Sequence, residues 1–452
     1  MEPRTEIPAV KLPAALQSAL WATRPDLLLA RCRQRFGDTF TLRFAGLGDV
    51  LFVSAPEDVR AVFTAPPSVV LAGRGNAFLR AVVGRHSLLT LDGEAHVRQR
   101  KLLVPPFHGE RIATYAKVIV EATERSLARW PREGAFETLR EMQAITLEVI
   151  VRAVLGVEDP SERRRFEALF NDFAAIGNSA ALLLPPLRVD LGPRSPWGRV
   201  LAVRARTDQA LFRELDRRRA LAASAPETEG ARRDVLALLL SARDDQGQAM
   251  SDRELRDELV TLLLAGHETT ATSLAWTMDL LSKHPEVLAK ARDEVSRVVG
   301  RESPDASAIA KLPYLDGVVR ESLRLRPVIP NVARIIEGEL HVAGATLRTG
   351  AGVAPCAWLT HTRPENWPAP NAFDPERWTR DKIDPHAFYP FGGGARRCIG
   401  MAFALYEMKT ILATVLAKRT FVAREGEGAR VARRGITLTP SGDGRVTLTA
   451  PT

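Results

Sequence analysis

Helical patterns of hydrophobic positions fill most of this chain, and one of them is unusually long. Apolar residues recur at helical spacing through most of residues 109–418. The longest pattern begins after Ser251, which has capping-box spacing to Glu254. It runs to about Ser282, where the His-Pro pair at 284–285 stops it. A helix of roughly thirty residues, rising ~1.5 Å per residue, spans ~45 Å. We therefore expect one helix to cross the whole molecule.

Strand patterns are confined to short segments near the two ends of the chain. Residues 39–44 and 50–53 alternate around a glycine turn, which predicts a hairpin. Residues 436–439 and 445–449 flank a Gly-Asp-Gly turn and predict a second hairpin. The Pro- and Gly-rich segment 364–394 predicts an irregular meander between helices.

The middle of the predicted long helix conflicts with its own surroundings. Residues 265–273 read Ala-Gly-His-Glu-Thr-Thr-Ala-Thr-Ser. Gly and Thr are poor helix formers, and a carboxylate at the centre of an apolar helix is costly. Threonine hydroxyls also bond back to the preceding turn and distort it. Such a conflict indicates a functional segment. The alternative is a kinked core helix in which Glu268 is exposed.

Composition and charge restrict the partners. Hydrophobic residues make up 45% of the chain and charged residues 26%, which is ordinary for a globular protein. The formal net charge is +9, but the arginines are scattered among acidic residues and form no basic stripe, so we expect no nucleic-acid partner. The positive charge belongs either to a solvated, arginine-rich surface or to a patch that docks an acidic protein.

Cysteine usage and the distribution of apolar residues predict a location. Cys32, Cys356 and Cys398 have neither disulfide nor zinc-site spacing, which favours a reducing compartment. The first thirty residues are too charged for a signal peptide, and no stretch reaches the ~18 apolar residues that a membrane span needs. We expect a cytoplasmic monomer with no membrane contact.

A glycine-rich loop around Cys398 has the chemistry of a metal-thiolate site. Residues 391–400 read Phe-Gly-Gly-Gly-Ala-Arg-Arg-Cys-Ile-Gly, and a helix is predicted directly afterwards. The glycines let the backbone approach a flat ligand, and the positive end of the helix would stabilise a thiolate. Phe391 would shield the sulfur, and Arg396 would neutralise a carboxylate of the ligand. The alternatives are a phosphate-binding loop, which lacks GxxxxGK[ST] here, and a turn with an inert cysteine.

Four sequence motifs together resemble the cytochrome P-450 family. The cysteine loop matches Phe-Gly-x-Gly-x-Arg-x-Cys-x-Gly at every defined position, and residues 265–269 resemble the family's oxygen-groove motif. Glu321-x-x-Arg324, together with Arg377, resembles its Glu-Arg-Arg cluster. The resemblance covers nearly the whole chain and implies a cytochrome P450 fold, which is mainly α, with a large helical domain, a long central helix and a small β-rich region. We expect a single domain over residues 1–452, with a helical part at about 90–330 and 398–420 and a β-rich part mainly at 36–65, 335–356 and 430–450.

The resemblance also implies roles for individual residues. Cys398 would be the axial ligand of a haem iron, and Glu268 and Thr269 would manage protons and a bound water in the oxygen groove. A buried structural network behind the haem would consist of Glu321, Arg324 and Arg377, the alternative being a surface pair. The other residues expected to contact the cofactor are His96, Arg100, Arg334 and Arg396, which would grip the propionates, and Ala265, Phe391, Gly392 and Gly400. For His96, the alternative is that it only packs nearby.

The implied reaction inserts one oxygen atom of O2 into a lipophilic molecule by hydroxylation or epoxidation. The cofactor would be haem b (iron protoporphyrin IX), with O2 as co-substrate. NAD(P)H would act indirectly, through a separate ferredoxin or flavodoxin and its reductase. A peroxide-driven peroxygenase is one rival, although there the acid-alcohol pair is replaced. A haem sensor or carrier is another, and it would not need that pair.

Two surfaces follow from the resemblance without being defined by a motif. The substrate would be a fatty acid, terpenoid, steroid or polyketide, and the apolar candidates for its pocket are Phe78, Leu79, Val82, Leu183, Val328, Ile329, Val332 and Ile436. An acidic ferredoxin would be steered to cations on the thiolate side, for which the candidates are Arg98, Lys101, Arg397 and Lys409.

Overall fold

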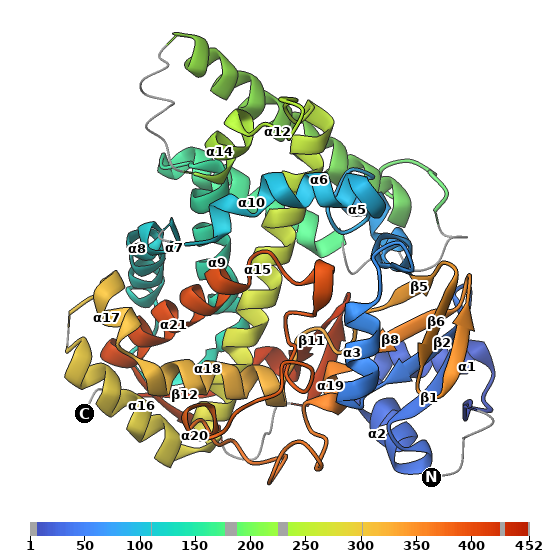
Figure 1. Ribbon diagram of the computed structural model, residues 1–452. Coiled ribbons are helices and arrows are strands. Elements are labelled where there is room, and N and C mark those ends of the chain that lie inside the picture. Colours follow the sequence, from blue (N-terminus) through green and yellow to red (C-terminus); the bar gives the residue numbers. More distant parts are fainter. Residues whose placement is uncertain are drawn as a thin grey trace.

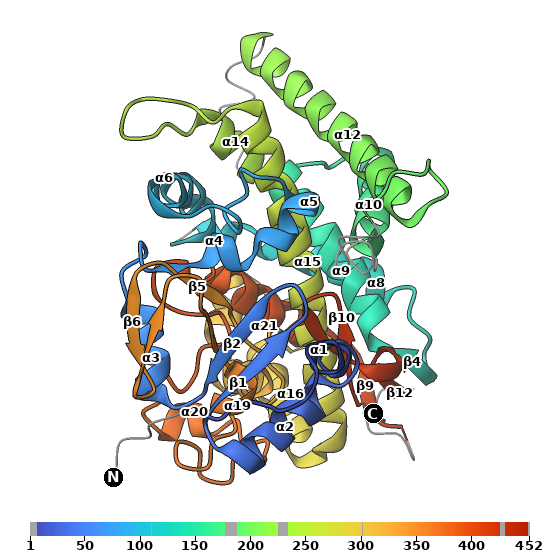
Figure 2. The same cartoon turned by 90° about the vertical axis from the view of Figure 1, so that its right-hand side faces the viewer.

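Helices and strands occupy different parts of the molecule. The computed structural model describes residues 7–109, 111–176, 188–224, 234–300, 302–424 and 430–450. The largest sheet lies beside the N-terminal helices, and helices make up most of the remainder (Figures 1 and 2). The longer helices are α1 (Ala14–Thr23), α2 (Pro25–Phe36), α3 (Pro56–Thr64), α6 (Gly93–Leu103), α8 (Ala116–Leu127), α9 (Thr138–Leu155), α10 (Pro160–Ile176), α12 (Pro196–Ser224), α14 (Val235–Ser241), α15 (Asp252–Lys283), α16 (Pro285–Val298), α18 (Pro313–Leu325) and α21 (Met401–Lys418). The short ones are α4 (Ala72–Gly75), η1 (Ala77–Leu79), α5 (Arg80–Val83), η2 (Pro105–Phe107), α7 (Arg111–Thr114), α17 (Ala306–Ala310), α19 (Ala357–Thr360), α20 (Arg377–Arg380), η4 (Gly394–Arg396) and η5 (Ser441–Asp443).

The long central helix is α15, whose 32 residues run through the middle of the molecule (Figures 1 and 2). Its predicted start is confirmed, because both hydrogen bonds of the capping box between Ser251 and Glu254 are present. Its end at Lys283 also agrees with the prediction. The largest apolar cluster includes the fully buried Val149 of α9, Leu274 of α15 and Ile411 of α21. Helix α15 is therefore a core element for most of its length.

The five-stranded sheet has the order β1-β2-β8-β5-β3. The first predicted hairpin is confirmed, since β1 and β2 pair antiparallel from Thr39 opposite Val53 to Phe44 opposite Gly48. Strand β8 joins β2 in parallel. The strands of this sheet are β1 (Thr39–Phe44), β2 (Gly48–Val53), β3 (Val70–Leu71), β5 (Arg334–Ile336) and β8 (Gly352–Pro355). The others are β4 (Gly134–Glu137), β6 (Glu339–Val342), β7 (Ala345–Arg348), β9 (Thr420–Ala423), β10 (Val431–Arg434), β11 (Thr437–Pro440) and β12 (Arg445–Thr449).

The second predicted hairpin is wrong in its pairing. Both strands exist, but β11 pairs with β10, while β12 pairs with β4 and β9. The amide of Leu438 donates a hydrogen bond to the carbonyl of Val328 (2.8 Å). The carbonyl of Leu438 accepts a hydrogen bond from the indole N–H of Trp276 (2.9 Å). These bonds attach β11 to the centre of the molecule, so the glycine turn separates two sheets. Strand β4 also lies inside the range expected to be helical, and α3 inside one expected to be β-rich.

Two further expectations concern segments without strong periodicity. The meander 364–394 contains, besides turns, only α20 and the first residue of η4, as its Pro and Gly content predicts. None of the helices in the described ranges is both long enough and apolar enough to span a membrane.

Candidate active site

The Cys398 loop lies between η4 and α21, and its shape depends on glycines. The amide of Cys398 donates to the carbonyl of Phe391 (3.0 Å), which closes the loop. Gly392 and Gly394 have φ angles of +67° and +63°, in the left-handed region that favours glycine. A Cβ on Gly394 would also lie 2.1 Å from the carbonyl oxygen of Phe63. Gly392 and Gly394 are thus needed for the backbone path itself.

The thiol of Cys398 is accessible to solvent yet surrounded by protein. Burial raises its pKa, while the amide of Gly400 and the charges of Arg100 and Arg397 oppose that rise. These properties fit a side chain that faces an enclosed space rather than bulk water. A thiol whose pKa is raised becomes a thiolate only with a strong compensating cation, such as a coordinated metal.

Residues in the middle of α15 are more exposed than the buried residues on either side of them. Ala265 is exposed and Thr269 half-buried, while Leu263 and Ala271 on either side are buried. The hydroxyl of Thr269 donates to the carbonyl of Ala265 at 2.6 Å, as expected for a threonine that bonds back along its helix. Its oxygen keeps lone pairs that can accept a hydrogen bond from water. This face of α15 is the predicted groove.

Glu268 lies beside that groove, and its carboxylate is held by two residues that the sequence did not indicate. Gln143 of α9 donates to Oε2 (3.1 Å), and Nε of Arg434 on β10 lies 3.5 Å from Oε1. The Glu268 side chain is 19% exposed, so the alternative of a solvated glutamate does not hold. No sequence signal connects Glu268 with positions more than a hundred residues away.

The four residues predicted to grip the propionates, His96 and three arginines, come together near the cysteine loop. Burial and, secondly, neighbouring arginines lower the pKa of His96 to about 3 and that of Arg334 to about 10, so His96 is neutral at pH 7. Burial also lowers the pKa values of Arg100 and Arg396. Asp92, which the sequence analysis missed, accepts a hydrogen bond from Arg396 and from the amides of Gly73 and Arg74. One carboxylate does not balance this cluster, which indicates a site for an anionic group.

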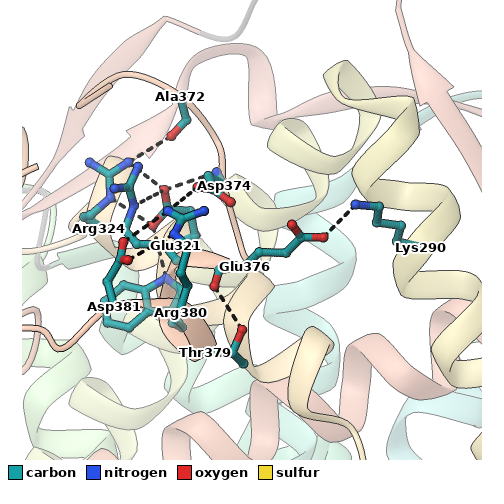
Figure 3. A network of polar contacts seen from close by, with 11 residues as sticks. Lys290, Glu321, Arg324, Ala372, Asp374, Glu376, Thr379, Arg380 and Asp381 are labelled. Carbon is teal, nitrogen blue, oxygen red and sulfur yellow. Dashed lines mark hydrogen bonds and ion pairs between the residues drawn. The ribbon is translucent and has the colours of Figure 1, made fainter. Parts of the chain in front are cut away.

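Glu321, Arg324 and Arg377 form a buried charge cluster, and the alternative of a surface pair is wrong. The exposed fractions of these three residues are 0%, 0% and 1%. Figure 3 shows Arg324 beside Glu321 and Ala372. Arg324 makes two hydrogen bonds to Glu321 and donates to the carbonyls of His361, Pro370 and Ala372, so all five of its N–H groups are used. Arg377 lies 3.5 Å from Glu321. The cluster ties α18 to the meander.

The predicted pocket residues differ in how far they are buried. Val82 and Val328 are buried in the protein, and Phe78, Leu79 and Ile329 are half-buried. Val332 is half-buried next to Gly392 of the cysteine loop, and Ile436 is 43% exposed in the turn between β10 and β11. Leu183 lies outside the described residues.

Three of the four expected docking cations are engaged in ion pairs. Arg98 pairs with Asp244 and Glu254 (2.6 and 2.7 Å), and Lys101 pairs with Asp245 (2.6 Å). Lys409 is 15% exposed and lies 3.8 Å from Asp316. Arg397 is exposed, and no described acidic residue pairs with it. The acidic partners lie far from these cations in the sequence, which is why the pattern did not reveal them.

These residues fit haem b. In the described ranges, no group of three or more His, Cys, Asp or Glu side chains could hold a metal ion on its own. An iron already held by a porphyrin needs only one protein ligand, which Cys398 can supply. The unbalanced cluster of His96 and three arginines suits the two propionates of that porphyrin.

Comparison with known proteins gives a consistent result. The family model "Cytochrome P450" matches residues 8–443. The chain is 36% identical over 443 residues to "Putative cytochrome P450 135B1" of Mycobacterium tuberculosis, covering 98% of this chain and 91% of that one. It is 37% identical over 442 residues to "Putative cytochrome P450 138" of the same species, covering 98% and 96%. The solved structure of retinoic acid bound cyanobacterial CYP120A1 superposes with a TM-score of 0.84 at 27% identity and covers 98% of this chain and 99% of that one. The chain therefore belongs to the cytochrome P450 family and is a haem-thiolate monooxygenase of that family.

Proposed function

We propose that this protein hydroxylates or epoxidises a lipophilic small molecule, with Cys398 as the axial ligand and Glu268 and Thr269 as the proton-handling pair. Electrons from NAD(P)H arrive through a separate ferredoxin or flavodoxin and its reductase. The observation that carries the proposal is the thiol of Cys398, accessible but enclosed, in a glycine loop beside an unbalanced cationic cluster. A single axial ligand, which Cys398 can supply as a thiolate, and cationic anchors for two carboxylates suit haem b.

The proposed role of each side chain follows from its position. Haem b, when bound, supplies the iron at which O2 is reduced and its O–O bond is cleaved, with one oxygen atom entering the substrate and the other leaving as water. Cys398 would hold that iron as a thiolate ligand, whose electron density would favour the cleavage. Thr269 can hold a water in the groove because its oxygen is free to accept. Glu268 holds a proton at the edge of the groove and passes it inward.

A lipophilic substrate is supported by apolar residues near the cysteine loop and the β10–β11 turn, among them the half-buried Val332 and the exposed Ile436. Apolar pockets with few polar groups bind apolar ligands. The similar CYP120A1 structure is described as retinoic acid bound, which agrees with this class of substrate. Fatty acids, terpenoids, steroids and polyketides all belong to it.

The test is a haem spin-state screen followed by turnover with surrogate redox partners. Fatty acids, terpenoids, steroids and polyketides are added to the ferric protein, and compounds that shift the Soret band are offered as substrates. Product that contains one atom of labelled O2 and depends on NAD(P)H is the expected result. Oxygenation that needs only hydrogen peroxide would indicate a peroxygenase instead.

The ligand assignment has its own test. Reduced protein with carbon monoxide should show the red-shifted Soret band of thiolate-ligated haem, and Cys398→Ala should abolish it. Cys32→Ala and Cys356→Ala are the controls, since both thiols are buried away from the loop and burial raises their pKa values. An unchanged band in Cys398→Ala would exclude Cys398 as the ligand.

A further inference from the structure

Arg433 is a half-buried cation at the junction of β10 and α1. Its Nε donates to the carbonyl of Gly435 (2.9 Å), and its Nη1 donates to the carbonyl of Trp21 (3.0 Å). The guanidinium also lies over the indole of Trp21, 5.5 Å from the ring centroid. An arginine side chain has five N–H groups, so three of them have no acceptor among the described residues. These contacts hold the guanidinium in place and leave part of it free for a ligand.

Trp21 gives the guanidinium a rigid support. Its indole makes edge contacts with the rings of Phe44 and Phe52, with 5.7 Å between the centroids in each case. Phe52 is 1% exposed and belongs to the apolar cluster that α2 shares with the five-stranded sheet. Trp21 therefore cannot move away from Arg433 without disturbing that cluster.

The charge of Arg433 is not balanced by any carboxylate in the described part of the chain. The next residue, Arg434, forms an ion pair with Glu268 of α15 (3.5 Å). Successive residues of a strand point to opposite faces, so the Arg433 side chain leaves β10 on the face away from Glu268. Burial lowers the pKa of Arg433, and no neighbouring negative charge opposes this change.

Acidic side chains on the elements next to Trp21 already have partners. Asp26, in the first turn of α2, lies 3.4 Å from Nε of Arg24. Asp49 of β2 lies 2.5 Å from Nε of Arg43. A half-buried guanidinium that has free N–H groups and no carboxylate beside it is suited to an anionic ligand.

Apolar surface beside this cation indicates what the rest of the ligand is. The turn that follows Arg433 exposes Ile436, which is 43% accessible and is one of the candidates for the substrate pocket. An inorganic anion would gain nothing from this side chain, whereas the hydrocarbon of an amphipathic molecule would bury against it. The two features together fit a carboxylate attached to an apolar chain.

We infer that Arg433 binds the carboxylate of a lipophilic carboxylic acid at the junction of α1 and the β10–β11 turn. This inference rests on the proposed function, because it names a class of substrate within it. The carboxylate accepts hydrogen bonds from Nη1 and Nη2, and Ile436 contacts the adjoining hydrocarbon. Among lipophilic molecules of similar size, the protein therefore selects those that carry a carboxylate.

Two ligands with the same alkyl chain test the inference. Decanoate and 1-decanol are titrated into the haem-loaded ferric protein by calorimetry at neutral pH and low salt. The wild type should bind decanoate about tenfold more tightly than decanol, the effect of hydrogen bonds to a charged group. Arg433→Met should remove this preference and leave the affinity for decanol unchanged, which also shows that the variant is folded.

Two further variants serve as controls. Arg433→Lys should restore only part of the preference, because lysine keeps the charge but lacks the planar fork of N–H groups. Arg430→Met removes the same charge from an exposed arginine just before β10 and should leave both affinities unchanged.

The outcomes separate the inference from the function it rests on. Absence of decanoate binding, equal affinities of the wild type for the two ligands, or a preference that survives in Arg433→Met would overturn the inference. Equal loss of both ligands in Arg433→Met would show a structural role for Arg433 and would also overturn it. The proposed function fails on a different result, namely that no compound gives an NAD(P)H-dependent product containing an atom of O2.

Salt dependence gives a second measurement. Added salt should weaken the binding of decanoate to the wild type and leave that of decanol unchanged, because a partly exposed ion pair is screened. In Arg433→Met this salt dependence should disappear. If it persists there, another cation holds the carboxylate, and the inference is wrong.

Discussion

Thr269 makes the sharpest distinction between a monooxygenase and a protein that only binds haem. Its hydroxyl is already engaged with the carbonyl of Ala265 as a donor, which leaves it one role toward the groove, that of an acceptor. A water bound there would have a defined orientation. In the proposed mechanism, the direction of proton delivery therefore depends on this one hydroxyl.

Thr269→Ala should leave folding, haem content and the carbon monoxide spectrum intact, because it removes only the hydroxyl and a methyl group. NAD(P)H oxidation should continue, but electrons should leave as hydrogen peroxide. Product per NAD(P)H should fall by about tenfold or more, within the range for misplaced proton transfer. The measurement is the ratio of product to NAD(P)H, with peroxide assayed in parallel.

Thr270→Ala is the internal control for that experiment. Thr270 is buried at 3% exposure and points away from the groove face. Loss of coupling in Thr270→Ala with wild-type coupling in Thr269→Ala would mean that the wrong hydroxyl had been chosen. Wild-type coupling in both would remove this stretch of α15 from the mechanism.

At the residue scale, the sequence indicated the residues proposed to react better than the residues that contact them. Cys398, Glu268 and Thr269 stand in motifs whose spacing is local, so a linear pattern can contain them. Gln143 and Arg434 touch Glu268 only because α9 and β10 pack on α15, and no local pattern encodes that. For the same reason, the acidic partners of Arg98 and Lys409 were not foreseen.

Among the elements, the first turns of α15 hold the segment that precedes α6. Arg256 bonds to Asp208 of α12 (2.7 Å), and the carboxylate of Asp257 accepts from the amide of His86 (2.9 Å). Glu258 accepts from the amide of Leu88 (2.7 Å), while its second oxygen is buried without a partner. The predicted pocket segment just before these residues thus depends on α15 for its position.

Glu258→Gln should stabilise the protein more at pH 8 than at pH 5. Burial raises the pKa of Glu258 to about 8, above the value of ~4.3 in an unfolded chain. The folded state therefore binds this proton more tightly. Its contribution to stability is complete below pH ~4.3 and declines by about 1.4 kcal/mol per pH unit up to pH 8. Glutamine does not titrate, so urea unfolding across this range should show the difference between the two proteins widening with pH. A constant difference would mean that Glu258 titrates normally.

The cluster behind the meander gives a second prediction for an element. Arg324→Ala leaves Glu321 buried without its main partner and removes donors from three carbonyls, so it should cost about 3–5 kcal/mol and yield little haem-loaded protein. Arg320→Ala is the matched control on the same helix, since its pair with Asp316 is partly exposed and contributes at most ~1 kcal/mol. Haem content and thermal unfolding are the measurements. Equal behaviour of the two variants would contradict a dominant role for the buried cluster.

Helices and strands with clear local sequence signals were predicted well, whereas the pairing of the strands was predicted less well. The capping box and the Pro after α15 determine where that helix begins and ends. The first hairpin was recognisable because its two strands are neighbours in the chain. Strand β12 instead pairs with β4, some three hundred residues earlier, and alternation alone does not specify a partner at that distance.

Across the whole molecule, the formal net charge is +9, but many arginines form ion pairs with acidic side chains. Those arginines attract an acidic partner protein less strongly than unpaired ones would. Arg397, exposed beside Cys398, is the candidate cation for which no described acidic residue forms an ion pair. We therefore expect docking of an acidic redox protein to depend on few charges near the cysteine loop.

Arg397→Glu should lower the rate at limiting ferredoxin by roughly two- to fivefold at low salt, because electrostatic steering raises association rates. Added salt should slow the wild type and reduce the difference, since screening weakens steering. Arg348→Glu, the same charge change at a side chain 81% exposed on β7, is the control. Equal rates and equal salt dependence in Arg397→Glu and wild type would place the docking face elsewhere.

The attachment of the β10–β11 turn bears on how this protein can acquire new substrates. The bonds that fasten β11 to Val328 and Trp276 use only the main chain of Leu438. The side chain at Ile436, at the tip of the turn, is 43% exposed and takes no part in that fastening. Mutations at this position therefore change the surface offered to a ligand while the scaffold stays in place. Because the two roles are separate, substitutions at this position can change substrate selectivity, in evolution or in laboratory selection, with little loss of folding stability.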